Sequence, residues 1–431
     1  MQLIRKLMIS WVMIFSSVFL VFGQSSAKAD SCETGDNTAY GLINPVVKGN
    51  TAFALDLYAQ LKTAKSGNLF YSPYSISTAL AMTYAGAKGE TGTQMSKVLH
   101  FPECQTALHP AFSLLQDQIN DAAQKNIKLS IANALWGQKG HPFRKEFKDA
   151  VKNYYKAALK EVDFRTAYEA ARKVINAWVE KKTHEKIKDL VPKRVLKPMT
   201  RLVLVNAIYF KGNWASPFKT GDTKDMPFMV TPNNSVEVPM MTQKSYFGYK
   251  KNDSLQVLEL PYAKNRLENP LELPSSYDDN TVSMIVLLPR QRDGLAELES
   301  SLNPANLDEW LDGLRRKKVK VFLPKFKVST GFELSNTLKK MGMPDAFNDD
   351  ADFSGMDGTT DLSIMSIIHK AFVDVNEKGT EAAAATAVFV GTRGLPPPTP
   401  TFRADHPFIF LIRHNSSGSI LFMGRVVNPV K

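Results

Sequence analysis

Cysteine is scarce in this chain. Only two of its 431 residues are cysteines, Cys32 and Cys104, so the fold cannot depend on a framework of disulfides. The two can pair if the chain passes through an oxidising compartment, but the sequence does not decide between a bridge and two free thiols. A chain of this length, with 44% hydrophobic residues, is long enough to build a large core without bridges.

Short enzyme signatures are absent as well. The sequence has no G-x-S-x-G, no Walker A lysine motif and no H-E-x-x-H, since His184-Glu185 is followed by Lys188 where a second histidine would be needed. We therefore expect no catalytic residues, no metal site and no required cofactor, and we predict that the protein is not an enzyme.

Long hydrophobic runs are confined to the N-terminus. Arg5 and Lys6 precede an apolar run over 7–23, and Ala27-Lys28-Ala29 follows as a small-residue cleavage site. Residues 1–29 are therefore predicted to be a cleaved signal peptide, with an uncleaved membrane anchor as the alternative. Since no later segment is apolar enough to cross a membrane, we expect a secreted, extracellular protein, or a periplasmic one if the source is bacterial.

Acidic residues are outnumbered by basic ones. The formal net charge is +12, and it is +9 without residues 1–29, which hold three basic and no acidic residues. Such a surplus favours contact with polyanions such as glycosaminoglycans, although most basic runs are solvated faces. One amphipathic stretch has enough basic residues to form a patch for heparin or a similar polyanion: Arg172, Lys173, Lys181, Lys182, Lys186 and Lys188.

Helical patterns dominate the first part of the chain and strand patterns the rest. Helices are predicted from about Asn50 to Leu61, from the Ser72-Pro73 cap to Gly86, from Gly89 to Leu99 and over 176–190. Strands are predicted at 202–210, 256–260, 282–288, 319–328 and 371–375, and a hairpin at 408–412 and 420–423. This order, without regular βα alternation, predicts an α+β fold with N-terminal-weighted helices and mainly antiparallel sheets.

The segment 377–401 combines conflicting local preferences. Alanines 382–385 follow Thr380, a candidate N-cap, and are typical of a short surface helix. The chain then changes to Thr386-Ala-Val-Phe-Val390, which favours a strand, and continues through Arg393 into a proline-rich tail. A short helix explains only the alanines and not the change to strand-favouring residues that follows them.

As a strand, the same segment separates into two faces. Positions 380, 382, 384, 386, 388, 390 and 392 share one face, which is uncharged and mostly small, whereas Glu381, Phe389 and Arg393 lie on the other. No proline interrupts 380–392, but four prolines follow Gly394 and forbid a continuous ladder there. The segment is thus predicted to exist either as an exposed loop or as a sheet strand.

These residues also resemble a known family. The run Glu377-Lys-Gly-Thr-Glu-Ala-Ala-Ala-Ala-Thr386 resembles the reactive-loop hinge of an inhibitory serpin. The stretch from Asn68 to Leu80 is similar to the serpin shutter helix, and the stretch from Asn206 to Trp214 to the strand that leads into the breach. The resemblance covers nearly the whole chain after the predicted signal peptide.

The resemblance implies one serpin domain over 30–431, with an exposed reactive loop at about 377–401. Arg393–Gly394 would be the bond that a protease cuts, although an error of one residue would give Thr392 or Gly394 instead. A suicide-substrate mechanism would follow, in which the cut loop inserts into the central sheet and traps the acyl-enzyme. The residues to which the resemblance gives roles are Glu377, Gly379, Thr380, Ala382 and Ala384 at the hinge, Ser72, Ser75, Asn206 and His369 at the shutter, and Trp214 at the breach.

Arginine before the scissile bond fits the acidic primary pocket of a trypsin-like serine protease, which is the expected partner of a monomeric inhibitor. Two alternatives remain: an arginine-specific cysteine protease as the target, and a non-inhibitory carrier or chaperone of the same family. A non-inhibitory member should carry a charged or bulky hinge residue, whereas Thr380 and the alanines are small. The excursion 265–280 is longer than the family's usual connection and suggests no role by itself.

Overall fold

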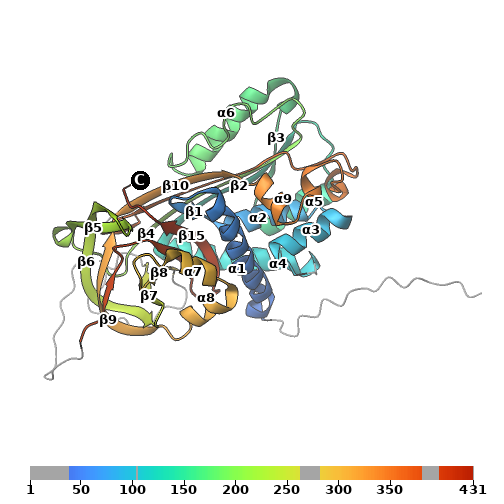
Figure 1. Ribbon diagram of the computed structural model, residues 1–431. Helices are drawn as coiled ribbons and strands as arrows, with labels where there is room; N and C mark the ends of the chain where they lie inside the picture. The colour runs from blue at the N-terminus through green and yellow to red at the C-terminus, as the bar shows by residue number, and fades with distance from the viewer. Residues whose placement is uncertain (1–37, 103–104, 263–281, 381–397, 431) are drawn as a thin grey trace, which may run out of the picture. The chain divides into compact units, whose positions relative to one another are not determined.

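The computed structural model describes residues 38–102, 105–262, 282–380 and 398–430, which belong to one compact unit (Figure 1). Helices and two β-sheets share this unit, as the α+β prediction requires. The helices are α1 (Ala39–Ala64), α2 (Pro73–Tyr84), α3 (Gly89–Leu99), α4 (Gln105–Asn126), α5 (Lys145–Tyr155), α6 (Phe164–Lys182), α7 (Leu295–Ser301), α8 (Pro304–Leu311), α9 (Ser335–Met341) and α10 (Ser354–Asp357). None of the helices in these ranges has the length and apolarity needed to cross a membrane.

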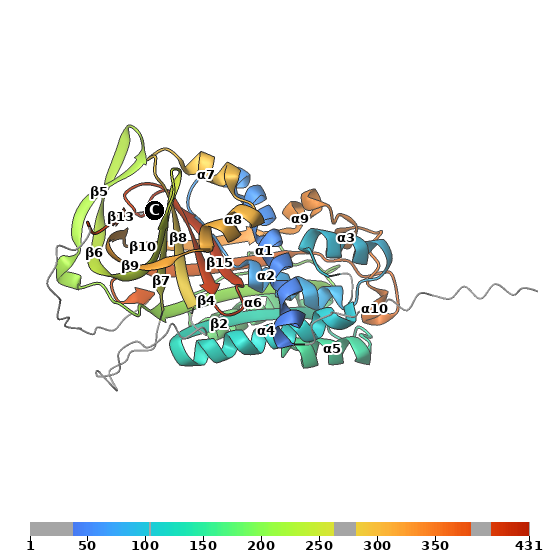
Figure 2. The ribbon, with the colours of Figure 1, turned by 90° about the horizontal axis from the view of Figure 1, so that it is seen from below.

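One sheet carries the elements on which function will depend. Its strands run in the order β10 (Phe326–Glu333), β11 (Ile367–Val375), β4 (Leu202–Asn213), β2 (Ile127–Gln138) and β3 (Leu159–Val162), and the short β12 (Gly379–Thr380) also pairs with β4. We call it the six-stranded sheet. Helix α6 covers one face, and helices α1, α2 and α4 lie on the other (Figures 1 and 2).

The second sheet has nine strands and is also mainly antiparallel. Its order is β1 (Leu69–Tyr71), β15 (Ile420–Val426), β14 (Phe408–His414), β8 (Val282–Pro289), β7 (Leu255–Pro261), β6 (Asn234–Lys251), β9 (Arg315–Pro324) and β13 (Thr401–Arg403), with β5 (Lys224–Thr231) paired to β6. Strands β14 and β15 form the predicted C-terminal hairpin across residues 415–419.

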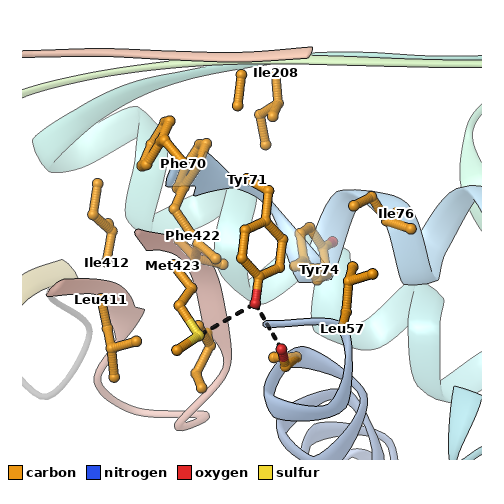
Figure 3. Packing of buried hydrophobic residues seen from close by; sticks show 14 of the residues in the cluster. Leu57, Phe70, Tyr71, Tyr74, Ile76, Ile208, Leu411, Ile412, Phe422 and Met423 are labelled. Atoms are coloured by element: carbon orange, nitrogen blue, oxygen red, sulfur yellow. Dashed lines mark hydrogen bonds between the residues drawn. The ribbon is translucent and has the colours of Figure 1, made fainter. Parts of the chain in front are cut away.

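The main core lies between the two sheets and the helices around α2. Tyr71 is fully buried there, and its hydroxyl donates to the carbonyl oxygen of Ala54 at 2.6 Å (Figure 3). The ring of Phe70 stacks with that of Phe410 and with that of Phe422. A smaller cluster fills the space between α6 and the other face of the six-stranded sheet. Even-numbered side chains of β4 contribute to the main core and odd-numbered ones to the smaller cluster, because strand side chains alternate.

Two sequence predictions need correction. The helix expected to reach residue 190 ends at Lys182, since His184 and Glu185 adopt left-handed backbone angles of 49° and 61°. The strand expected over 319–328 is two strands in different sheets, β9 and β10, which separate after Pro324. The elements that were not predicted include helices α4 and α5 and strands β2, β5 and β6.

Candidate functional site: the shutter and breach of the six-stranded sheet

The centre of the six-stranded sheet contains a parallel pair. Strands β11 and β4 pair in parallel from Ile367 opposite Leu204 to Phe372 opposite Tyr209, whereas β10–β11 and β4–β2 are antiparallel. We call the β4–β11 boundary the seam. Parallel pairing is slightly less stable per residue than antiparallel pairing, so the backbone pairing across the seam is expected to be weaker than that of β10–β11 and β4–β2 on either side.

Polar side chains join the two sides of the seam and connect them to α2. His369 on β11 donates from Nδ1 to Oδ1 of Asn206 on β4, directly opposite in the register. The amide nitrogen of Asn206 donates to Ser75 Oγ at 2.8 Å and to Asn133 Oδ1 at 2.7 Å. Ser72 caps α2, with Oγ accepting from the backbone N–H of Ser75 and donating to the carbonyl of Leu421. The four residues that the sequence assigned to the shutter therefore lie together.

One member of this shutter network was missed. Asn133 lies on β2, where no strand had been predicted, and its Oδ1 also accepts a hydrogen bond from Ser75 Oγ at 2.9 Å. Its amide nitrogen donates to the backbone carbonyl of Ser75. The only signal in the sequence would have been a polar residue within the run Ile131-Ala-Asn-Ala-Leu135.

The hydrogen bonds determine the charge of His369. Its Nε2 accepts from the backbone N–H of Ser72 at 3.2 Å, so only Nδ1 carries a proton and the ring is neutral. Complete burial lowers the pKa of His369 to about 3, because a charged ring would lose its hydration. The network thus depends on a histidine that stays uncharged at physiological pH.

The breach lies at the end of the seam beyond Phe372 and Tyr209. Trp214, immediately after β4, is buried and stacks on Tyr262 with ring centres 4.6 Å apart. Its indole N–H donates to the carbonyl of Asn376 at 3.0 Å, which holds the chain after β11 against the end of β4. Trp214, the residue assigned to the breach, therefore links the end of β4 to the chain that leaves β11.

Glu377 is fixed within the breach by charge and hydrogen bonds. Its carboxylate lies 3.0 Å from Lys325 Nζ and accepts from the Thr223 hydroxyl at 2.9 Å. Burial raises the pKa of Glu377, but hydrogen bonds from its own backbone N–H, Lys325 and Thr223 outweigh burial and bring the pKa below its usual value. This anchor sets the starting point of the segment that follows.

The chain turns at the breach and begins to add to the sheet. Gly379 has a φ of 134°, and a Cβ there would lie 2.2 Å from the carbonyl oxygen of Gly212, so glycine is required. Gly379 and Thr380 pair antiparallel with Asn213 and Gly212 of β4. The remaining predicted hinge residues, Ala382 and Ala384, and the predicted reactive bond Arg393–Gly394 lie outside the described residues.

The predicted basic patch is only partly on the surface. Arg172 is buried, and its guanidinium donates to Glu169 at 2.9 Å and to the carbonyl of Val191, so it is not part of an exposed patch. Lys188 pairs with Glu180 at 3.1 Å. The lysines of this group are all exposed: Lys173, Lys181, Lys182, Lys186 and Lys188.

Cys32, Cys104, the predicted signal peptide 1–29 and the excursion 265–280 also lie outside the described residues, so what was expected of them stays a prediction. Within the described ranges, no group of three or more histidine, cysteine, aspartate or glutamate side chains is arranged to hold a metal ion.

The described sheet thus combines a parallel central seam, a polar shutter and a chain that begins to pair with β4 at the breach. Comparison with known proteins identifies the family, because the model of the family described as "Serpin (serine protease inhibitor)" matches residues 48–429. The chain belongs to the serpin family. It is 42% identical to Serpin B3 of Homo sapiens over 407 residues, covering 90% of this chain and 100% of that one.

Two further relatives extend the comparison. The leukocyte elastase inhibitor of Sus scrofa is 44% identical over 385 residues, covering 88% of this chain and 98% of the relative. The crystal structure of uncleaved ovalbumin superimposes with a TM-score of 0.77 at 33% identity, covering 89% of this chain and 100% of ovalbumin. The family and fold predicted from the sequence are thereby confirmed.

Proposed function

We propose that this serpin is a secreted inhibitor of trypsin-like serine proteases, cleaved as a suicide substrate at Arg393–Gly394. The observation that carries the proposal is the β12–β4 pairing at the breach, because the following residues could continue its direction and register along β4. The protein would supply a bond to be cut and a conformational change, and the catalytic groups would belong to the protease.

The β12–β4 register can be continued along the seam. It would place Ala382 opposite Phe210, Thr386 opposite Asn206 and Val390 opposite Leu202. The even-numbered face of the loop would then face the main core, with the small residues next to the large side chains of β4. Thr386 would come between Asn206 and His369, so their hydrogen bond must break as the strand enters.

The register also explains why insertion would be favourable. A new strand between β4 and β11, antiparallel to both, would replace one parallel pairing by two antiparallel ones. It would satisfy the backbone groups of residues 381–390 within a sheet and bury Val388 and Val390. On this proposal the described sheet, with its seam closed, is the higher-energy state of the chain.

Arg393 would specify the target. An arginine before the scissile bond fits a primary pocket with a carboxylate at its base, as in trypsin. The same arginine would also suit an arginine-specific cysteine protease as the target. The alternative to an inhibitor is a carrier or chaperone of the same family without inhibitory activity. The small hinge residues favour an inhibitor, because a central strand must pass through a packed sheet.

One incubation tests the proposal. The protein without residues 1–29 is mixed with trypsin, and we expect a complex that survives denaturing electrophoresis together with a released fragment that begins at Gly394. Arg393→Ala should abolish the complex and leave the melting temperature unchanged, because the substitution removes only the pocket contact. Cleavage without a lasting complex would favour the non-inhibitory alternative, and trapping by Arg393→Ala would refute the assignment of the bond.

We further propose that residues 1–29 direct secretion and that the exposed lysines of α6 and of the segment after it bind a glycosaminoglycan activator. Acidic Glu180 and Glu185 lie among these lysines, so their field is weaker than the sequence suggested. Retention on heparin should fall steeply with salt and should decrease in Lys173→Ala/Lys181→Ala. Retention equal to that of an unrelated protein of the same charge would exclude the activator site.

A further inference from the structure

A histidine–aspartate pair lies at the end of the six-stranded sheet that is opposite the breach. Nε2 of His141 is 2.7 Å from Oδ2 of Asp357, and the side chain of Asp357 is completely buried. An ionised carboxylate accepts hydrogen bonds and cannot donate them, so Nε2 carries a proton and donates to Asp357. Hydrogen bonds to an ionised acceptor are among the strong ones in proteins. We call this pair the distal clasp.

His141 is held at the end of β2. Its backbone N–H donates to the carbonyl of Gln138, the last residue of β2, at 3.1 Å. The N–H of Gln138 donates in turn to the carbonyl of Arg201, immediately before β4, at 2.9 Å. Strands β2 and β4 are paired from Ile127 to Gly137 of β2. His141 therefore belongs to the half of the sheet that contains β2 and β4.

Asp357 is attached on the other side of the seam. It is the last residue of α10, and its carboxylate accepts from the backbone N–H of Thr359 at 2.8 Å and from the Thr359 hydroxyl at 3.0 Å. Within α10, the N–H of Gly355 donates to the carbonyl of Gly86, just after α2, at 3.1 Å. The next strand along the chain after α10 is β11.

Strands β10 and β11 are fixed to the same part of the molecule as α2. Thr330 on β10 is buried, and its hydroxyl donates to the carbonyl of Phe70 on β1 at 2.7 Å. Strand β1 leads directly into α2, and β10 is paired with β11. The distal clasp thus joins the half of the sheet with β2 and β4 to the half with β10 and β11.

The loop after β2 makes a second contact with α10, beside the clasp. Arg144 caps the start of α5, and its backbone N–H donates to the carbonyl of Met356 at 2.7 Å. A Cβ at Gly358 would lie 2.8 Å from Nη2 of Arg144, so the loop and the end of α10 are closely packed. Figure 2 shows α10 next to α5 at this end of the molecule.

We infer that His141 and Asp357 are positioning residues for loop insertion, and that the distal clasp slows the opening of the seam. A strand that enters between β4 and β11 separates them by one more strand spacing, about 4.8 Å. His141 then leaves Asp357, because a hydrogen bond does not extend over such a distance. The inference rests on the proposed function, since loop insertion is the step that the clasp controls.

The cost of opening falls on Asp357. Its carboxylate keeps the hydrogen bonds from Thr359 but loses the one from His141, and a buried charge that loses a partner is destabilised. This cost is present when the seam is open and absent when it is closed. The clasp therefore lowers the rate of opening without contact with the reactive bond.

The rate of opening is measured with a fluorescent peptide of residues 380–392, whose anisotropy rises as it anneals to the intact protein. Asp357→Asn should anneal about three to ten times faster than wild type, because it removes the charge and keeps the shape. The matched control is Asp56→Asn, which weakens a pair of the same kind, 2.7 Å from Asp56 to His100, between α1 and the end of α3. The control should anneal at the wild-type rate, and a wild-type rate for Asp357→Asn would overturn the inference.

A double variant shows whether the two residues act through each other. His141→Ala alone should also accelerate annealing, and His141→Ala/Asp357→Asn should be no faster than the faster single variant, because the same contact is lost in each. Accelerations that multiply in the double variant would mean independent effects and would overturn the clasp.

Melting temperatures separate the clasp from a contact that only supports the fold. Asp357→Asn should lower the melting temperature of the intact protein by about 2–4 °C and leave that of protein cut within the loop unchanged, because the clasp is already open in the cut form. Asp56→Asn should shift both forms equally. Equal losses in the two forms of Asp357→Asn would overturn the inference.

The same measurements distinguish failure of the inference from failure of the proposed function. If cutting the loop does not raise the melting temperature of the wild type, the proposed function fails. The annealing rates then still decide whether the clasp holds the seam, because the added peptide enters the sheet without a protease.

Discussion

At the residue scale, Thr380 lies within the predicted reactive loop and is its last described residue before position 398, and its backbone pairs with β4. It lies opposite Gly212, where even an added Cβ would come within 3 Å of Tyr262 and Ile127. Thr380→Arg should therefore prevent entry, because a charged group of this size has neither space nor hydration there.

We expect Thr380→Arg to be cleaved by trypsin at Arg393–Gly394 without a lasting complex, since docking at Arg393 is unaffected. Electrophoresis after mixing with trypsin measures the partition between cleaved inhibitor and complex. Thr360→Arg, an exposed substitution of the same chemistry far from the breach, serves as the control. Unchanged trapping by Thr380→Arg would show that insertion does not begin at this residue.

The low pKa of His369 predicts how the free energy of unfolding depends on pH. Its pKa is about 3 in the folded protein and about 6.5 when unfolded, so the unfolded chain binds the proton first as pH falls. Stability should be full above about pH 6.5 and should decline as pH falls toward 3, by at most about 1.4 kcal/mol per pH unit from this residue.

Unfolding by urea at several pH values, for wild type and His369→Gln, measures this contribution. Buried His109 and His414, whose pKa values burial also lowers to about 4, add to the slope of both proteins, so the difference isolates His369. Identical slopes between pH 7 and pH 5 would show that His369 is charged in the folded protein or that its neutral state does not matter.

Single residues were predictable where they belong to a contiguous motif. Ser72, Glu377 and Trp214 each lie within a contiguous stretch that resembles a family motif, so their positions in the sequence were enough to assign them. Asn133 and Lys325 were not assigned to the site, because each reaches it through a strand pairing or a side-chain contact that sequence order does not display. Arg172 looked exposed in a basic run, yet its partners Glu169 and Val191 bury it.

At the element scale, the seam between β4 and β11 should accept a strand from outside. A peptide with the sequence of residues 380–392 can follow the same register along β4, from Gly212 to Leu202. Incubation with this peptide should raise the melting temperature and convert the protein into a substrate of trypsin, because the site for its own loop is then filled.

The matched control is the same peptide with Thr386→Arg, which would bring a charge to Asn206 and His369 at the shutter. We expect no rise in melting temperature with this peptide, as followed by scanning fluorimetry. Equal effects of the two peptides would contradict the register that continues β12.

Helices and strands with strong caps or β-branched runs could be predicted to within a few residues, as α2 and β4 illustrate. Which strands pair with each other could not be predicted from the sequence. The strand predicted over 319–328 carries one continuous pattern, but its halves belong to different sheets, and only tertiary contacts separate them at Pro324. Strand β2 lacks a strong alternating pattern because both its faces are covered, one by α6 and one by the main core.

At the scale of the whole molecule, cutting the loop should make the protein more stable. Insertion would bury Val388 and Val390, at about 1.5–3 kcal/mol each, and would complete an antiparallel sheet. The melting temperature of protein cut by a protease within the loop should therefore exceed that of the intact protein by several degrees. Equal melting temperatures before and after the cut would mean that no strand has been added.

The length of β4 also sets a mechanical limit. In the continued register Val390 would lie opposite Leu202, the first residue of β4. The three residues from there to Arg393 form a linker of about 10 Å at full extension. A folded protease is wider than this linker is long, so the captured enzyme would be pressed against the end of the sheet and could not move away from it. Two glycines inserted before Arg393 should lengthen this linker and lower the tension on the acyl bond. The complex of that variant should therefore release active trypsin sooner than the wild-type complex. Equal lifetimes would show that tension on the acyl bond does not hold the enzyme.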